Sequence, residues 1–202
     1  MFKVLNLYAG IGGNRKLWDD ASVTAVEYNP EIAAIYQEYF PNDTVIVADA
    51  HEYLLQHYKE FDFIWSSPPC QTHGQLRKNL GVEAKGYAAV FPDLKLYEEI
   101  LFMQHYCKCS WVIENVIPYY KPLIAPTVKI QRHLFWSNFE ISAASFPAKG
   151  IRTKSKISDF DSLGYDLSKS KIPNKRQVLR NCVDFDLGKH IISCVPYLPE
   201  NG

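Results

Sequence analysis

The sequence predicts an α/β protein with a Rossmann-like, doubly wound and mostly parallel sheet. Short apolar runs, rich in β-branched and aromatic residues, alternate with segments of helical spacing along most of the chain. No internal repeat interrupts this alternation. With 202 residues, 47% of them hydrophobic, the chain is long enough for one large domain with a sizeable core.

The N-terminal half is expected to supply four strands and the helices that connect them. The apolar runs that predict strands cover residues 2–8, 22–29, 43–50 and 61–67. Apolar residues at helical spacing predict helices over 30–40, with Pro30 in the first turn, and over 52–60. The stretch "GGNRKLWDD" (12–20) is expected to open a further helix after the first strand.

The C-terminal half continues the pattern and then breaks it. A helix over 94–106, a strand over 110–116 and a sixth strand over 133–141 are expected, and helical spacing returns at 177–192. Residues 142–173 are rich in Ser, Lys and Asp and lack periodicity. We therefore expect a catalytic domain made of 1–141 and 174–202, with 142–173 as a small basic insert.

Charge and cysteine content indicate which ligands and which cellular setting to expect. The formal net charge is zero, yet residues 149–180 carry nine Lys or Arg against three acids, a local charge of +6. Such a segment suits a polyanion, although a solvated loop has the same composition. The five cysteines are odd in number and no secretory signal or apolar membrane span is visible, which predicts a reduced, cytoplasmic setting. Cys107 and Cys109 are too close for a usual zinc pair, so no metal is expected.

Ligands of a doubly wound sheet bind at the carboxyl ends of its strands, and three stretches there suit a nucleoside. Gly10, Gly12 and Gly13 follow the first strand and allow a ligand to approach the backbone closely. Glu27 ends the second strand, where a carboxylate accepts hydrogen bonds from ribose hydroxyls, and Asp49 ends the third. The glycine spacing fits neither a dinucleotide fingerprint nor a P-loop. An adenosine-bearing cofactor without phosphates fits better.

The next two strand ends carry a thiol and a carboxylate. Cys70 follows two prolines in "SSPPCQTHG" (66–74), a mounting that suits a nucleophile whose position must be fixed. Glu114 lies in an apolar strand, where a lone carboxylate is rare and a raised pKa would let it hold a proton. The two groups are expected to converge beside the cofactor.

At this point the motifs resemble those of the DNA (cytosine-5)-methyltransferases, which use S-adenosylmethionine. "LNLYAGIGG" looks like the first motif of that family, "VEYNPE" and "ADA" like its adenosine-binding strand ends, and "SSPPCQ" like its Pro-Cys nucleophile motif. "IENV" matches its Glu-Asn-Val, and "LRNCV" (179–183) resembles its last motif, which closes the cofactor site. The resemblance covers roughly 1–140 and 174–195, and it implies the fold of class I S-adenosylmethionine-dependent methyltransferases.

The resemblance assigns roles to individual residues. Cys70 is the expected nucleophile on cytosine C6, Glu114 the expected proton donor at N3, and Arg132 the residue that holds the cytosine O2 or orients Glu114. The cofactor is expected to contact Tyr8, Ala9, Gly10, Ile11, Gly12, Gly13, Glu27, Tyr28, Asp49, Ala50, Pro69, Leu96, Asn181 and Cys182. Phosphate contacts are expected from Arg77, Lys78, Arg152, Lys154 and Lys156. Residues 71–92 are the expected lid over a base flipped out of double-stranded DNA.

Within the matching motifs, Asn6 stands where aspartate is usual, Tyr8 where phenylalanine is usual, and Arg180 and Cys182 depart from the last motif. Three larger departures remain. Thr72, His73 and Gly74 follow the cysteine motif in place of the usual x-Phe-Ser. The Gln-x-Arg-x-Arg motif is reduced to "KIQRHLFW" (129–136), with Gln131 and Arg132 as the nearest counterparts. The recognition region shrinks to about thirty residues, between 142 and 173.

Other functions remain open on the sequence alone. An adenine-N6 or cytosine-N4 methyltransferase would place an aromatic residue where Cys70 stands. A transfer-RNA cytosine-5 methyltransferase suits the small recognition region. From a different class, the chain is also compatible with a cofactor-binding module that needs a protein partner, or a homodimer, to recognise DNA. The target sequence and the biological setting, in a bacterium or a phage, are not specified by these residues.

Overall fold

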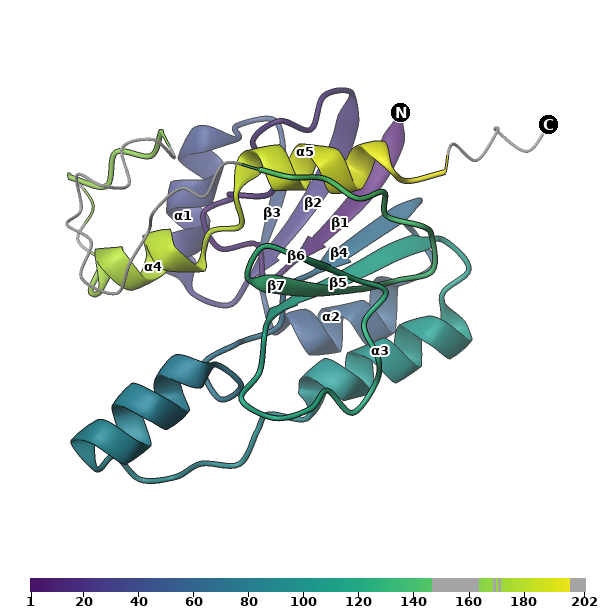
Figure 1. The fold of residues 1–202 in the computed structure, drawn as a ribbon. Helices are drawn as coiled ribbons and strands as arrows, with labels where there is room; N and C mark the ends of the chain where they lie inside the picture. Colours follow the sequence, from purple (N-terminus) through teal and green to yellow (C-terminus); the bar gives the residue numbers. More distant parts are fainter. Residues whose placement is uncertain (147–163, 169, 171, 197–202) are drawn as a thin grey trace.

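A single seven-stranded sheet organises the part of the chain that the computed structural model describes, residues 1–146, 164–168, 170 and 172–196 (Figure 1). The strand order is β3-β2-β1-β4-β5-β7-β6. The strands are β1 (Phe2–Leu7), β2 (Ala21–Glu27), β3 (Thr44–Val47), β4 (Phe63–Ser66), β5 (Ser110–Val116), β6 (Val128–Ile130) and β7 (His133–Ser137). The doubly wound, mostly parallel α/β sheet that the sequence predicted is confirmed.

The parallel part of the sheet brings five strand ends to one edge. Strands β3, β2, β1, β4 and β5 are parallel neighbours, and Leu7 pairs with Val26 on one side and with Ser66 on the other. The hairpin of β6 and β7 adds to β5 in the antiparallel sense. Every residue of β4 is buried, as expected for a strand covered on both faces.

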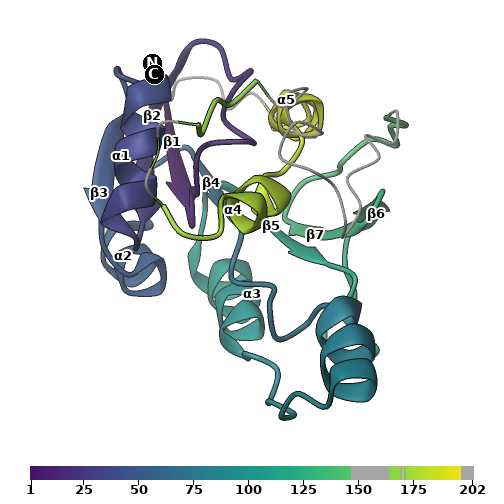
Figure 2. The same ribbon diagram turned by 90° about the vertical axis from the view of Figure 1, so that its left-hand side faces the viewer.

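In the described part of the chain, α-helices cover both faces of the sheet (Figures 1 and 2). Helices α2 (Ala50–His57) and α3 (Lys95–Tyr106) lie on one face, where Leu54 and Ile100 join Leu5 and Ile64 in the larger core. Helices α1 (Pro30–Tyr39) and α5 (Phe185–Ser193) lie on the other face, and α4 (Lys175–Asn181) is near α1. Burial on both faces therefore explains why the strands read as continuous apolar runs.

Local sequence signals set the helix boundaries. Asn29 caps α1 by accepting hydrogen bonds from the backbone amides of Glu31 and Ile32, and Pro30 follows at the first helical position. Asp49 caps α2 in the same way. Within the expected lid, residues Arg77–Glu83 form the π-helix η1, and this segment projects away from the sheet (Figures 1 and 2).

The structure corrects three expectations of secondary structure. The helix predicted from residue 12 is wrong: successive turns replace it, with Arg15 N–H bonded to Gly12 O and Trp18 N–H to Arg15 O. The reason is that Gly12 has φ +82 and the side chains that follow bond across the loop rather than along a helix. The segment 177–192 holds two helices, because Asp184 begins a new one. The three-residue strand β6 was not expected.

The basic segment is described only in part. Residues 164–168, 170 and 172 pack against the body, since Tyr165, Leu167 and Ile172 are buried with Ile11 and Leu179. Most of the insert, and with it Arg152, Lys154 and Lys156, lies outside the described residues. The division into a catalytic domain and an insert stays a prediction.

Candidate active site

Five residues that the sequence singled out lie along the carboxyl edge of the parallel strands. Tyr8 follows β1, Asp49 and Cys70 come two and four residues after β3 and β4, and Glu27 is the last residue of β2. Glu114 lies in β5, one residue beyond Ile113, which pairs with the last residue of β4. Ligands of doubly wound sheets bind along this edge, so the arrangement forms one candidate site.

The glycine loop and Glu27 form the first part of this site. Gly10 donates its backbone N–H to Glu27 Oε2 at 3.0 Å, and Asn29 N–H donates to Glu27 Oε1 at 2.9 Å. Gly10 has φ +56, and a Cβ added there would meet no heavy atom within 4 Å. The loop backbone therefore faces open space beside a carboxylate, as a bound nucleoside requires.

The C-terminal segment packs closely against the same loop. A Cβ on Gly13 would lie 2.6 Å from the backbone oxygen of Val183 and 2.9 Å from Cys182 Cβ, so only glycine fits. Cys182 is buried, which raises the pKa of its thiol to about 12, and Asn181 is exposed at the end of α4. The contact brings "LRNCV" beside the first motif, and that this segment closes a cofactor site stays a prediction.

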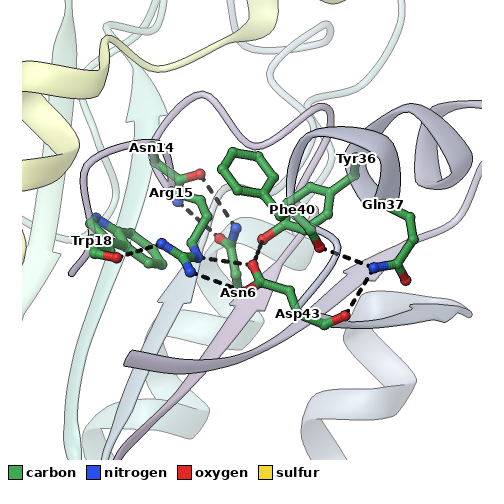
Figure 3. Close-up of polar contacts among 8 residues, drawn as sticks. All are labelled: Asn6, Asn14, Arg15, Trp18, Tyr36, Gln37, Phe40 and Asp43. Carbon is green, nitrogen blue, oxygen red and sulfur yellow. Dashed lines mark hydrogen bonds and ion pairs between the residues drawn. The ribbon is translucent and has the colours of Figure 1, made fainter. Parts of the chain in front are cut away.

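An ion pair beneath the glycine loop fixes its path (Figure 3). Arg15 donates to both carboxylate oxygens of Asp43, at 2.8 and 3.0 Å, and to Trp18 O at 2.5 Å. Tyr36 OH donates to Asp43 Oδ2 at 2.8 Å. Only 14% of the Arg15 side chain and 3% of the Asp43 side chain is exposed. The guanidinium of Arg15 is thus committed to Asp43, which agrees with a ligand that carries no phosphate.

Two asparagines continue this network into the sheet (Figure 3). Asn6 and Asn14 exchange hydrogen bonds, Nδ2 of each donating to Oδ1 of the other at 3.3 and 2.9 Å, and both are buried. Asn6 stands where the resembled family usually has aspartate. Its amide partner explains the difference, because two facing amides satisfy each other without burying a charge.

The other residues expected at the cofactor differ in exposure. Tyr28 is 76% exposed and Pro69 is exposed, so both are accessible to a ligand. Ala9, Ile11, Ala50 and Leu96 are buried, and Leu96 belongs to the core beneath the sheet. Asp49 accepts hydrogen bonds from the amides of His51 and Glu52, so one of its oxygens serves α2 as a cap.

A side chain from the neighbouring strand fixes the turn that carries Cys70. Asn115 Nδ2 donates to Pro68 O at 2.9 Å, and its own Oδ1 accepts from Val116 N–H. Beyond the cysteine, Gly74 forms a bridge with Pro118. The segment that also carries Glu114 therefore contacts the Pro-Pro-Cys turn on both sides. These contacts hold the backbone of the turn in place.

Burial controls the acidity of both candidate catalytic groups. Burial raises the pKa of Cys70 to about 11, and the negative charge of Glu114 adds to the effect, whereas Arg132 and Arg180 oppose it. Burial also raises the pKa of Glu114 to about 7, against the opposing hydrogen bond with Ser67 and the charge of Arg132. At neutral pH the thiol is thus protonated and the carboxyl group is close to half protonated.

His133 contacts Glu114, and the sequence did not identify it. Its Nε2 lies 3.5 Å from Glu114 Oε1, while Arg132 Nη2 donates to Arg180 O at 3.0 Å. Burial lowers the pKa of His133 to about 3, so the imidazole is neutral, and its Nδ1 has no hydrogen-bond partner among the residues that the structure describes. The sequence held one signal for His133, because this residue follows Arg132 in the segment that departs from the Gln-x-Arg-x-Arg motif.

The expected phosphate-binding residues of the lid make internal contacts. Arg77 donates to Ala88 O at 3.0 Å and lies over the Tyr87 ring, and Lys78 Nζ lies 3.6 Å from Glu83 Oε1. Within the described ranges there is no group of three His, Cys, Asp or Glu that could hold a metal ion. In the same part of the chain, no helix has the length and apolarity needed to cross a membrane.

Residues 2–98 match the family model of the C-5 cytosine-specific DNA methylases. The resemblance read from the motifs is confirmed over these residues. The matched range contains the glycine loop, Glu27, Asp49 and Cys70, and it ends before Glu114. No curated protein matches this chain.

Several solved structures are similar to part of the chain. A mutant of DNMT2 from Spodoptera frugiperda has 24% identity and a TM-score of 0.41, and the match covers 57% of this chain and 36% of that one. The methyltransferase EhMeth from Entamoeba histolytica has 17% identity and a TM-score of 0.38, with 57% and 38% covered. A putative DNA modification methyltransferase encoded within an Escherichia coli prophage has 20% identity and a TM-score of 0.38, with 60% and 34% covered. This chain thus spans well under half the length of each.

Proposed function

We propose that the chain is an S-adenosylmethionine-dependent methyltransferase that methylates C5 of cytosine in DNA. The observation that carries the proposal is the pairing of Cys70 with Glu114 at adjacent strand ends, joined by the Asn115–Pro68 hydrogen bond. Cys70 lies within the segment, 2–98, that matches the C-5 cytosine-specific DNA methylases, and Glu114 follows that segment. A thiol and a protonatable carboxyl group are the two functions that cytosine C5 chemistry requires.

The residues of the glycine loop fit the proposed cofactor. When bound, S-adenosylmethionine supplies an electrophilic methyl group on a sulfonium. Glu27 would accept hydrogen bonds from the ribose hydroxyls through lone pairs left free by its two backbone contacts. Tyr28, which is exposed, would cover the adenine, and the open face of Gly10 leaves room for the rest of the nucleoside.

Cys70 and Glu114 would act together on the cytosine ring. C5 is a poor nucleophile, and attack of the Cys70 thiolate on C6 makes the ring an enamine whose C5 can take a methyl group. The attack places negative charge on the ring, and the proton held by Glu114 neutralises it at N3. After methyl transfer the C5 proton leaves to a base, the C6–S bond breaks, and Cys70 is regenerated.

The position of Cys70 requires that the target base leave the DNA double helix. A base stacked inside a duplex cannot reach a thiol that is itself only partly exposed, so the cytosine would be flipped out at a cost of a few kcal/mol. The segment 71–92, which projects from the body beside Cys70, would close over the flipped base.

Methyl transfer from labelled S-adenosylmethionine to unmethylated duplex DNA tests the proposal. Nucleoside digestion and mass spectrometry are expected to find 5-methylcytosine. N4-methylcytosine or N6-methyladenine would contradict the role of Cys70, and label on transfer RNA alone would contradict the DNA substrate. DNA labelling that appears only with a second protein would favour the binding-module alternative.

Two variants separate the chemistry from cofactor binding. Cys70→Ala is expected to abolish methyl transfer and to leave binding of S-adenosylhomocysteine, measured by calorimetry, within twofold of the wild type. Glu27→Ala is expected to weaken that binding at least tenfold, because it removes a charged acceptor from the ribose site. Turnover by the cysteine variant, or an unchanged dissociation constant in the glutamate variant, would refute the respective assignment.

A further inference from the structure

Glu99 is a buried carboxylate that the proposed chemistry does not use. It lies on α3, on the face turned toward the sheet, and its exposed fraction is 0%. Carboxylates are almost never fully buried unless other groups satisfy them. The partners of Glu99 therefore indicate what this side chain is for.

Both oxygens of Glu99 are engaged by residues from other elements. Oε1 accepts a hydrogen bond from Tyr8 OH at 2.5 Å and lies 3.1 Å from His51 Nδ1. Oε2 accepts from Ser66 Oγ at 2.6 Å. These three contacts satisfy a charge that would otherwise destabilise the core by several kcal/mol.

The partners of Glu99 lie at the carboxyl edge of the sheet, where the cofactor is proposed to bind. Tyr8 directly follows β1, Ser66 is the last residue of β4, and His51 lies in the first turn of α2. Glu99 thus joins α3 to the ends of two central strands and to the start of a helix. These contacts join residues between 33 and 91 positions apart in the sequence.

Two of the three contacts, those with Tyr8 and His51, also reach residues expected to bind the cofactor. Tyr8 opens the glycine loop with φ +55, a left-handed conformation that is unfavourable for tyrosine, and its hydroxyl is fixed by Glu99. His51 donates its backbone N–H to Asp49 at 2.9 Å. Leu96 lies one helical turn before Glu99 on α3.

Charged side chains of α3 lie around His51. Its Nδ1 faces Glu99, its Nε2 lies 3.6 Å from Glu98 Oε2, and Lys95, 3.8 Å from Asp49, lies on the same helix as both glutamates. The hydrogen bond to Glu99 raises the pKa of His51 above its usual value, with desolvation and Lys95 opposing the effect.

We propose that Glu99 is a positioning residue for the cofactor site, holding Tyr8, Ser66 and His51 in the one arrangement that forms the wall beneath the adenosine. The inference rests on the proposed function in that it takes this edge as the cofactor site. Glu99 touches no reacting atom and acts only through its three partners. A preformed wall reduces the ordering that binding would otherwise require.

Adjacent glutamates on α3 provide a matched pair of variants. Glu99→Gln keeps the shape of the side chain but removes its charge, and Glu98→Gln removes a charge that also faces His51 from a side chain that is 62% exposed. In the first variant the pKa of His51, followed by NMR titration, is expected to fall toward its usual value. Binding of S-adenosylhomocysteine, measured by calorimetry, is expected to weaken about tenfold, as loss of a hydrogen bond to a charged group implies.

The control and the possible results separate this inference from the proposed function. Glu98→Gln is expected to lower the pKa of His51 less and to leave binding within twofold. If Glu99→Gln unfolds, Tyr8→Phe replaces it, since this variant keeps the ring and loses only the hydroxyl; weakened binding is again expected. Unchanged binding in a folded Glu99 variant, while the wild type binds, would overturn the inference alone. No binding by the wild type would overturn both.

Discussion

Replacement of Glu114 by glutamine is expected to change the shape of the pH–rate profile as well as the rate. In the proposed mechanism the reactive enzyme has a protonated Glu114 and an ionised Cys70. The pKa of Glu114 is about 7 and that of Cys70 is about 11, so the group with the lower pKa has to keep its proton while the other loses it. The reactive form, with protonated Glu114 and ionised Cys70, has the same net charge as the form with ionised Glu114 and protonated Cys70. The reactive form is thus the less populated of the two.

The size of this minor population follows from the two pKa values. Between pH 7 and pH 11 the ratio of the reactive form to the form with ionised Glu114 and neutral Cys70 is constant, at about one in 10⁴. This corresponds to about 5 kcal/mol, at about 1.4 kcal/mol per pKa unit. Below pH 7 both groups are protonated, and the reactive form falls about tenfold per pH unit.

The wild type and the variant are therefore expected to diverge above neutral pH. The kcat/KM of the wild type, which reports the free enzyme, should rise up to about pH 7 and then stay level. In Glu114→Gln only the thiol titrates, so the much lower kcat/KM should keep rising about tenfold per unit, roughly 100-fold between pH 7 and pH 9. The rise ends below pH 11, because the variant lacks the charge that helps to raise the pKa of Cys70.

Steady-state methylation of duplex DNA over pH 6 to 9 is the measurement. Glu140→Gln, which removes an exposed carboxylate after β7, is the control and should retain the wild-type profile. Parallel profiles for the wild type and Glu114→Gln would refute the reasoning, because Glu114 would then hold no proton that the reaction uses.

Two further substitutions test the supports of the site. Arg15→Ala leaves the buried Asp43 carboxylate without its cation and should lower the free energy of unfolding by about 3 kcal/mol, a fall in Tm of about 6 to 12 °C in a thermal melt; Lys78→Ala, at an exposed pair, should cost less than about 1 kcal/mol. Asn115→Ala frees the Pro68 carbonyl and should lower kcat about tenfold or more, with S-adenosylhomocysteine binding unchanged; a normal kcat would show that the turn is fixed without Asn115.

Much of the fold was predictable because its strands are buried on both faces. A continuous apolar run such as β4, bounded by polar residues, carries the signal in its own sequence. The error at 12–20 has a different origin, since Asn14 bonds to a partner on β1 and Arg15 to one in the loop before β3 rather than along a helix. Propensity describes a segment alone, and here long-range polar contacts decide its conformation.

The candidate site likewise contains residues that the sequence could locate and one that it could not. Glu27, Asp49 and Cys70 could be located because parallel strand ends must meet at one edge, a rule that needs only the order of elements. Glu99 could not be located so, since its role depends on which face of α3 meets the end of β1. Its neighbour Glu98 has the same chemistry and is largely exposed, and only the packing of α3 distinguishes the two.

The neutral histidine beside Glu114 bears on why this carboxyl group keeps its proton. A cation within contact distance would favour the carboxylate and hold the pKa of Glu114 down. His133 lies 3.5 Å away but stays uncharged because burial lowers its pKa to about 3, while the Arg132 guanidinium is turned toward Arg180 O. Burial of Glu114 is opposed by the hydrogen bond with Ser67 and by the charge of Arg132, yet it still raises the pKa to about 7. A neutral His133 in the segment that departs from the Gln-x-Arg-x-Arg pattern thus adds no positive charge against the proton that the proposed reaction needs.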